Sequence, residues 1–170
     1  CVQGAYRPKN GEPRVLPIVQ STTYKYDSSV EMGNLFDLKA SGYFYSRLQN
    51  PTNDTVAGKI TMLEGGVAGM LTSSGQAANF YAVFNIAQAG DHIVSSSAIY
   101  GGTYNLFNVT MRKLGIDFTF VSPDADEEEI QAAFKPNTKA VFGETNLTQA
   151  LIFLILSALQ RWHTKMVFRL

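Results

Sequence analysis

The sequence is poor in cysteine, in histidine and in net charge. Of its 170 residues one is Cys and two are His, while 14 Lys and Arg balance 14 Asp and Glu. The single Cys1 excludes an internal disulfide framework and a cysteine-based metal cluster. A net charge near zero argues against nucleic acid or an anionic membrane as the main partner. No signal-peptide pattern is present, and we therefore expect a cytoplasmic protein.

The apolar content is ordinary, but the charges are unevenly distributed. Hydrophobic residues make up 45% of the chain, which permits a sizeable core. All 14 acidic residues lie in residues 1–145, where the net charge is −3. Residues 146–170 contain three basic residues, no acidic residue and the only Trp. This change in composition predicts a boundary near residue 145.

Residues 1–66 predict an N-terminal arm followed by helices. Three prolines within the first 27 residues make that stretch irregular and extended. Ser28, with Glu31 three residues later, forms a capping-box pattern for a helix that we expect to end at Gly42. A second helix is expected from Asn53 to Glu64. We expect it to bury three apolar side chains, which are Val56, Ile60 and Leu63.

Residues 67–145 predict a partial cofactor-binding α/β domain, because strands and helices alternate. The expected strands are 67–72, 92–96, 116–121 and 139–143, and the expected helices are 75–88, 104–114 and 124–134. Alternation at this spacing indicates βαβ units and a largely parallel sheet covered by helices. In such sheets ligands bind at the carboxyl ends of the strands.

The most informative segment is Ser73-Ser74-Gly75-Gln76, where an expected strand gives way to a helix. Free backbone N–H groups and the positive end of the helix dipole meet at such a point, and together they form a natural cradle for a phosphate. A plain serine-capped helix is the commoner explanation of the same residues. Neither a G-x-G-x-x-G fingerprint nor a P-loop lysine motif accompanies the segment.

Two further segments carry candidate ligands. Tyr45-Ser46-Arg47 could clamp an anion, because Arg binds phosphate through two N–H groups and Tyr adds a hydroxyl. Tyr100, after the strand expected at 92–96, could cover a flat ring. A surface Arg and a packed Tyr are the commoner alternatives. His92 is expected to have a packing role, because residues 1–145 contain no second His for a metal site.

Six stretches, in the same order, resemble the Cys/Met-metabolism family of pyridoxal-phosphate (PLP) enzymes. They are Pro17–Tyr24, Tyr45–Arg47 with Asn50–Thr52, Leu63–Gly66, Ser73–Ala78, Tyr100–Thr103 and Gly143–Thr145. The resemblance covers residues 1–145, and residues 34–39 look most like the O-acetylhomoserine sulfhydrylase (O-acetylhomoserine aminocarboxypropyltransferase) branch. Cystathionine γ-synthase and methionine γ-lyase are the alternatives within the family. The resemblance implies a truncated PLP-dependent transferase fold of type I, consisting of the N-terminal arm and the first βα units of the large domain.

The resemblance also implies a cofactor, a reaction and an assembly. The cofactor is pyridoxal 5'-phosphate, and the reaction replaces the acetate of O-acetyl-L-homoserine with sulfide in methionine and cysteine biosynthesis. The family forms homotetramers with shared active sites, and we expect neither a nucleic-acid nor a membrane partner. By resemblance, Gly75 and Gln76 would donate backbone N–H groups to the cofactor phosphate, and Tyr100 would stack on the pyridine ring. Tyr45 and Arg47 would reach the phosphate in the neighbouring subunit's site.

The sequence departs from the family pattern after Thr145. In the family, the Schiff-base lysine and the acid beside the pyridine nitrogen follow this point, and neither has a counterpart here. His163-Thr164-Lys165 resembles the lysine site only faintly and lies too close to Glu144. We therefore expect no catalytic residue in this chain, no covalent attachment of the cofactor and no turnover by the chain alone. A non-catalytic fragment that binds phosphate or docks on a partner is the alternative.

We interpret residues 146–170 as a non-family tail, the product of a frameshift near Thr145. Codons for residues 151–170 can be chosen so that another reading frame encodes a segment resembling the family's next helix. Trp162 and Met166 each have a single codon. At these two positions the match between the other reading frame and the family therefore involves no choice of codon. A membrane anchor is disfavoured because Leu151–Leu159 is too short to span a bilayer. A basic amphipathic interaction helix is the other alternative.

Overall fold

The chain divides into two compact units in a computed structural model, Cys1–Thr72 and Ser73–Leu170. The structure describes residues 4–144. The expected frameshift tail lies outside the described residues, so its origin stays a prediction. Among the helices of the described part, none has the length and apolarity needed to cross a membrane.

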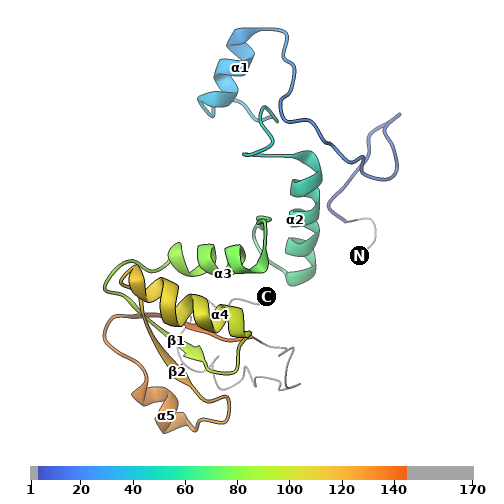
Figure 1. Ribbon diagram of the computed structural model, residues 1–170. Coiled ribbons are helices and arrows are strands. Elements are labelled where there is room, and N and C mark those ends of the chain that lie inside the picture. The colour runs from blue at the N-terminus through green and yellow to red at the C-terminus, as the bar shows by residue number, and fades with distance from the viewer. Residues whose placement is uncertain (1–3, 145–170) are drawn as a thin grey trace. The chain divides into compact units, whose positions relative to one another are not determined.

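The first unit consists of an extended arm and two helices, α1 (Ser29–Phe36) and α2 (Pro51–Glu64) (Figure 1). Residues 4–27 contain no helix, so the expected irregular arm is confirmed for the part that the structure describes. The only pairing recorded for this arm is an isolated antiparallel bridge between Thr23 and Tyr45, within the described residues. The arm is therefore held mainly by side-chain hydrogen bonds rather than by a sheet.

The start of α1 follows the sequence prediction, but its end does not. The capping box is confirmed, because the Ser28 hydroxyl accepts the Glu31 N–H at 3.2 Å and the Glu31 carboxylate accepts the Ser28 N–H at 3.2 Å. The helix ends at Phe36 rather than near Gly42. Leu38 has a left-handed φ of 55°, which stops further helical hydrogen bonding before the glycine is reached.

The second helix begins at Pro51 rather than at the expected Asn53. Asn50 caps it, with its Oδ1 accepting the Thr52 N–H at 2.9 Å, and a proline fits the first helical position. The expected burial of its apolar side chains is wrong. The exposed fractions are 43% for Val56, 50% for Ile60 and 60% for Leu63. Within the described part of the first unit, no second apolar layer packs against these side chains.

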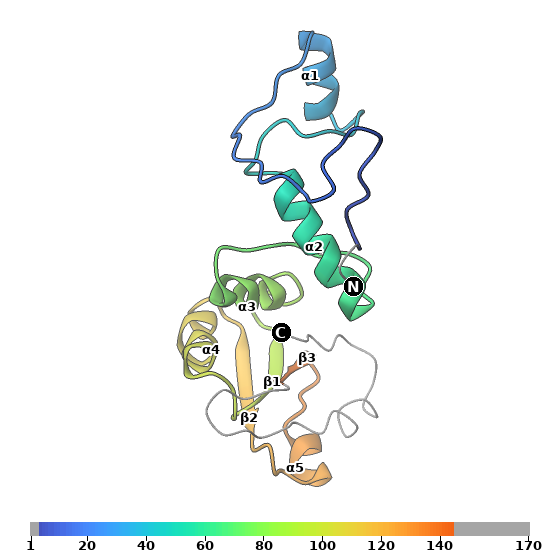
Figure 2. The same ribbon diagram turned by 90° about the vertical axis from the view of Figure 1, so that its right-hand side faces the viewer.

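The second unit is a three-stranded sheet with helical segments (Figure 2). Its elements are α3 (Gly75–Phe84), β1 (His92–Ser96), α4 (Gly101–Asn105), the π-helix η1 (Leu106–Met111), β2 (Asp117–Val121), α5 (Glu127–Ala132) and β3 (Thr138–Phe142). The strand order is β2-β1-β3, and both pairings are parallel. The expected α/β class with a parallel sheet is thus confirmed, and β1 has the predicted bounds.

The strand expected at 67–72 does not form. Val67 is fully exposed, and Met70 is 76% exposed. A strand needs a neighbour for its N–H and C=O groups. Within the described residues, the sheet consists of β2, β1 and β3, and this segment pairs with none of them. The apolar run is therefore not sufficient to make a strand.

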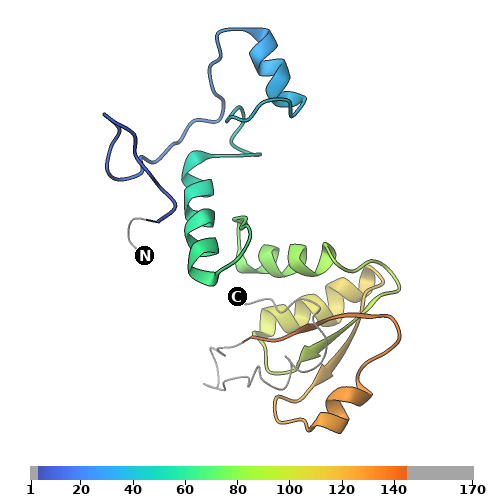
Figure 3. The ribbon, with the colours of Figure 1, turned by 180° about the vertical axis from the view of Figure 1, so that it is seen from behind.

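The core of the second unit lies between the sheet and the segments α3, α4 and η1. Phe107 of η1 stacks on Phe118 of β2 with ring centroids 4.7 Å apart, and it meets Phe142 of β3 edge-on at 4.8 Å. The α4 helix lies in front of the strands in Figure 1 and behind them in Figure 3, so these helices cover one side of the sheet. The short α5 buries no residue and lies away from α3 (Figure 2).

The buried His92 joins all three strands. Its Nδ1 lies 2.8 Å from the Thr138 hydroxyl of β3, and its Nε2 lies 2.9 Å from the Thr119 hydroxyl of β2. Its side chain is fully buried, as its expected packing role requires. Burial lowers the pKa of His92 below the usual 6.5, and Lys135 lowers it further, while Asp117 acts in the opposite direction.

Candidate functional site

The start of α3 presents two backbone donors to open space. Ser74 caps the helix, and its hydroxyl accepts the Ala77 N–H at 3.1 Å. The N–H groups of Gly75 and Gln76 have no acceptor among the described residues. A Cβ at Gly75 would meet nothing within 4 Å, so there is open space beside this residue. The arrangement fits an anion such as a phosphate.

Gly102 brings the side chains of Gln76 and Tyr100 together. A Cβ built on Gly102 would lie 2.5 Å from Tyr100 Cε1 and 2.7 Å from Gln76 Nε2. Both side chains therefore lie against the same stretch of backbone. Tyr100 is 53% exposed, so part of its ring remains accessible to a ligand. The structure thus places three of the five predicted site residues together, all in the second unit.

A buried contact fixes α3 relative to α4. The Asn79 Nδ2 donates to the Thr103 hydroxyl at 2.9 Å, and both side chains are buried. Asn79 lies three residues after Gln76, and Thr103 lies three residues after Tyr100. The bond therefore holds the two helix starts that carry the candidate ligands. Asn79 Oδ1 is buried and has no hydrogen-bond partner within the described part of the chain.

Glu144 contacts Tyr100 from the end of another strand. Its Oε2 accepts the Tyr100 backbone N–H at 2.9 Å, across 44 residues of sequence. Tyr100 follows β1, and Glu144 follows the adjacent parallel strand β3. The contact lies at the carboxyl edge of the sheet, where α/β sheets bind ligands. The sequence analysis gave Glu144 no role, because nothing local signals so distant a partner.

Tyr45 and Arg47 lie in the first unit and pack against each other. The Arg47 Cζ lies 5.1 Å from the centroid of the Tyr45 ring, which is a cation–π contact. Arg47 is exposed, and it forms no ion pair with a described residue. The two residues are therefore free to bind an anion together. Their expected action in a neighbouring subunit stays a prediction.

Asn50 anchors the Tyr45–Arg47 segment. Its Nδ2 donates to the Ser46 hydroxyl at 3.0 Å and to the Val19 C=O at 3.1 Å. The Val19 N–H in turn donates to the Thr52 hydroxyl at 2.9 Å. These bonds join the arm, the Tyr45–Arg47 segment and the start of α2. They explain why Asn, Pro and Thr occur together at residues 50–52.

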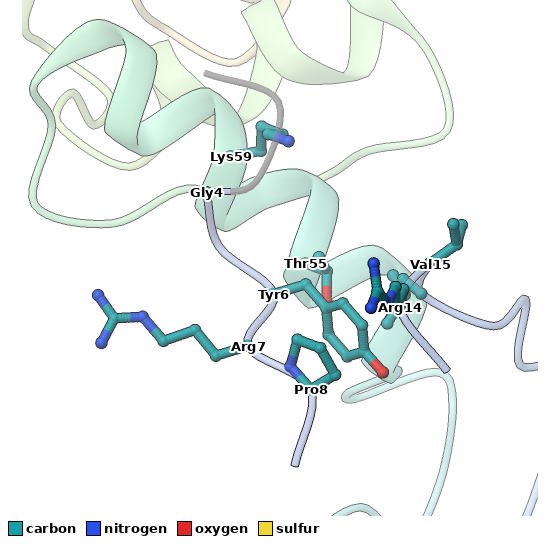
Figure 4. Close-up of a pocket in the computed structure, with 9 residues that line it drawn as sticks. Gly4, Tyr6, Arg7, Pro8, Arg14, Val15, Thr55 and Lys59 are labelled. Atoms are coloured by element: carbon teal, nitrogen blue, oxygen red, sulfur yellow. The ribbon is translucent and has the colours of Figure 1, made fainter. Parts of the chain in front are cut away.

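A separate cavity of about 910 Å³ lies in the first unit (Figure 4). Its lining contains Arg7, Arg14 and Lys59 but no acidic residue, so the cavity is positively charged. In Figure 4, Arg7 extends away from the ring of Tyr6, and the basic side chains are spread around the cavity rather than converging on one point. None of the five predicted site residues lines it. The cavity is therefore separate from the residues predicted to bind the cofactor.

Comparison with known sequences identifies relatives of this chain. A family model for Cys/Met metabolism PLP-dependent enzymes matches residues 1–155. The chain is 52% identical to the O-acetyl-L-homoserine sulfhydrylase of Corynebacterium glutamicum over 132 residues, which are 78% of this chain and 30% of that protein. It is 45% identical to the homocysteine/cysteine synthase of Saccharomyces cerevisiae, also over 78% of this chain and 30% of that protein. The chain thus spans about 30% of the length of these curated relatives.

Solved structures share the fold. A candidate O-acetylhomoserine (thiol)-lyase of Campylobacter jejuni, solved with a pyridoxyl-lysine monophosphate, is 33% identical with a TM-score of 0.84, covering 93% of this chain and 39% of that chain. The metB protein of C. glutamicum is 32% identical with a TM-score of 0.82, covering 94% and 40%. These matches confirm the expected type I fold, of which the described residues form a partial α/β domain. They also confirm that pyridoxal phosphate is the cofactor of the family.

Proposed function

Because the chain belongs to the Cys/Met metabolism family of PLP-dependent enzymes, we propose that it carries the N-terminal, cofactor-binding part of an O-acetylhomoserine sulfhydrylase. The observation that carries the proposal is the start of α3 at Gly75 and Gln76, where the Gln76 side chain lies against the same Gly102 position as the ring of Tyr100. The names of the relatives in C. glutamicum and S. cerevisiae support this branch of the family. The substrates would be O-acetyl-L-homoserine and sulfide. The cytoplasmic location stays a prediction.

Each candidate residue has a distinct task in this proposal. The Gly75 and Gln76 N–H groups bind the cofactor phosphate, aided by the positive end of the α3 dipole. Tyr100 would hold and orient the pyridine ring. The bound cofactor supplies the electron sink for bond cleavage in the amino-acid substrate. Tyr45 and Arg47 add a hydroxyl and a guanidinium to the phosphate of the neighbouring subunit in a homo-oligomer.

Calorimetric titration of the 170-residue chain with pyridoxal 5'-phosphate tests the proposal. We expect saturable binding, and much weaker binding of pyridoxal, because pyridoxal lacks the phosphate that α3 holds. The Gly75→Asp variant should abolish binding by placing a carboxylate before the two donors. The fold should be retained, because that position is open and an acid suits a helix start. Gly33→Asp, also in open space but on α1, is the matched control.

The same preparation distinguishes binding from turnover. No lysine of residues 1–145 matches the family's cofactor lysine, so we expect no absorbance of a lysine-bound cofactor. We also expect no homocysteine from O-acetyl-L-homoserine and sulfide. Either signal would contradict the expected inactivity of the chain alone. Failure of the folded chain to bind pyridoxal 5'-phosphate would contradict the proposed function itself.

The exposed apolar side chains of α2 favour a second candidate function. Val56, Ile60 and Leu63 could pack against another subunit, so the chain could act as a non-catalytic fragment that docks on a full-length homologue. Co-expression with an intact sulfhydrylase tests this, and co-purification of the two chains is the supporting result. A cystathionine γ-synthase or methionine γ-lyase type of activity would appear instead as a different substrate preference in such a mixed assembly.

A further inference from the structure

The α4 helix begins without a cap of its own. The first N–H groups of a helix lack intrahelical acceptors, and a Ser, Thr, Asp or Asn side chain usually accepts one of them. The other described α-helices follow this rule, with the cap residues Ser28, Asn50, Ser74 and Asp126. At α4 the cap position is occupied by Tyr100, which makes no side-chain cap hydrogen bond. This helix start therefore depends on an acceptor from elsewhere.

Glu144 supplies that acceptor. The Tyr100 N–H donates to Glu144 Oε2 at 2.9 Å, just as the Ser28 N–H donates to the Glu31 carboxylate at 3.2 Å in the capping box of α1. Glu31 lies three residues from its partner, whereas Glu144 lies 44 residues away. A hydrogen bond to a carboxylate is about twice as strong as a neutral one, and a negative charge is favourable near a helix start. The end of β3 thus holds the residue that follows β1.

This bond restrains the backbone that carries the ring of Tyr100. Tyr100 has φ −51° and ψ 132°, so it lies outside the helical turn. Its side chain is half exposed, and its recorded close neighbours are the Gly102 backbone and, through it, Gln76. A half-exposed ring is held in place partly by the position of its own backbone. The bond to Glu144 holds that backbone at the end of β3.

We propose that Glu144 is a positioning residue, which holds Tyr100 beside the start of α3 so that its ring can cover the pyridine ring of the cofactor. The inference rests on the proposed function, because it assigns Glu144 to the same site. Glu144 acts through its bond to the Tyr100 backbone and not through contact with the cofactor. Loss of that bond therefore reduces cofactor affinity by loosening the ring, while leaving the phosphate donors of α3 in place.

Three substitutions of Glu144 in the full chain distinguish the effect of side-chain length from the effect of charge. Glu144→Gln keeps the length of the side chain and a carbonyl acceptor, Glu144→Asp keeps the charge but shortens the side chain, and Glu144→Ala removes both. Affinity for pyridoxal 5'-phosphate should fall about tenfold in the Asp and Ala variants and at most about threefold in the Gln variant. Amide hydrogen exchange of Tyr100 should be faster in the Asp and Ala variants and nearly unchanged in the Gln variant.

Glu31→Ala is the matched control, because it removes the equivalent cap hydrogen bond in α1. It should leave the cofactor affinity unchanged. If affinity is unaltered in the Asp and Ala variants although the parent chain binds, the positioning role is wrong and the proposed function stands. If affinity falls in the Gln and Ala variants but not in the Asp variant, the charge rather than the length of the side chain is required, which also overturns the proposal. A folded parent chain that binds no cofactor overturns both the proposed function and this inference.

Discussion

Gly102 shows how closely the candidate site is packed at the scale of single residues. A Cβ at this position would approach the Tyr100 ring to 2.5 Å and the Gln76 amide to 2.7 Å, whereas a Cβ at the preceding Gly101 would meet nothing within 4 Å. Both obstructing atoms belong to side chains, and these can move without unfolding the helix. The substitution would therefore displace the two candidate ligands while leaving the backbone in place.

We predict that Gly102→Ala weakens binding of pyridoxal 5'-phosphate about tenfold, because Tyr100 and Gln76 must both shift. The thermal midpoint should change little. Ala is favoured over Gly within a helix by about 1 kcal/mol, and this gain offsets the cost of displacing the two side chains. Gly101→Ala is the control, and it should keep the parent affinity. Calorimetric titration with parallel thermal melts measures both quantities. Equal affinities for the two variants would show that a side chain at position 102 does not disturb the site, which contradicts the prediction.

Local pattern and long-range contact explain which site residues could be predicted. Gly75 and Gln76 were predicted because a strand-to-helix transition with small residues is visible within a short window. Tyr100 was predicted because it follows an expected strand, and Tyr45 and Arg47 because a hydroxyl and a guanidinium occur together on a short segment. Glu144 and Gly102 could not be assigned roles, because their importance depends on contacts between separate elements. The stretches that contain them were identified only through their resemblance to the family.

At the scale of secondary-structure elements, His92 makes the stability of the sheet depend on pH. Its ring bonds the hydroxyls of Thr119 and Thr138, and the buried site disfavours the imidazolium, so the pKa of His92 lies below 6.5. The facing charges are Lys135, which also lowers the pKa, and Asp117, which raises it. The unfolded chain therefore binds a proton more readily than the folded chain as the pH falls below 6.5.

We predict that His92 makes the folded state less stable as the pH falls from 7.5 through 6.5 toward its lowered pKa, by at most about 1.4 kcal/mol per pH unit. Its full contribution is present above 6.5. Urea unfolding at several pH values measures the effect. His92→Gln should remove this part of the pH dependence. His163→Gln, at the only other histidine, should keep it, and an unchanged profile in the His92 variant would contradict the assignment.

A predicted strand forms where its apolar pattern is accompanied by neighbouring strands with which it can pair. The β1 strand has its predicted bounds because an apolar run lies between two turn signals and finds β2 and β3 beside it. The run at 67–72 carries a similar signal, but it finds no pairing in the described sheet. The helix expected at 104–114 begins at Gly101 and widens into the π-helix η1. That widening leaves no mark in the hydrophobic pattern.

At the scale of the whole molecule, one stretch of the first unit carries many exposed apolar side chains. Large apolar side chains there are at least 41% exposed: Val56, Ile60, Met62, Leu63, Val67, Met70 and Leu71. Soluble monomers rarely leave such surface uncovered, because its burial is favourable by about 25 cal/mol per Å². We therefore expect these side chains to favour association of the chain.

We predict that the purified chain self-associates as its concentration rises, because association buries these side chains. Size-exclusion chromatography with light scattering measures the mass across concentrations. The double substitution Val67→Ser and Met70→Ser should shift the distribution toward monomer, because both positions are among the most exposed apolar ones. Val109→Ser, at a 41% exposed apolar position on η1, is the control and should leave the distribution unchanged. A parent chain that stays monomeric at every concentration would show that these side chains do not drive association.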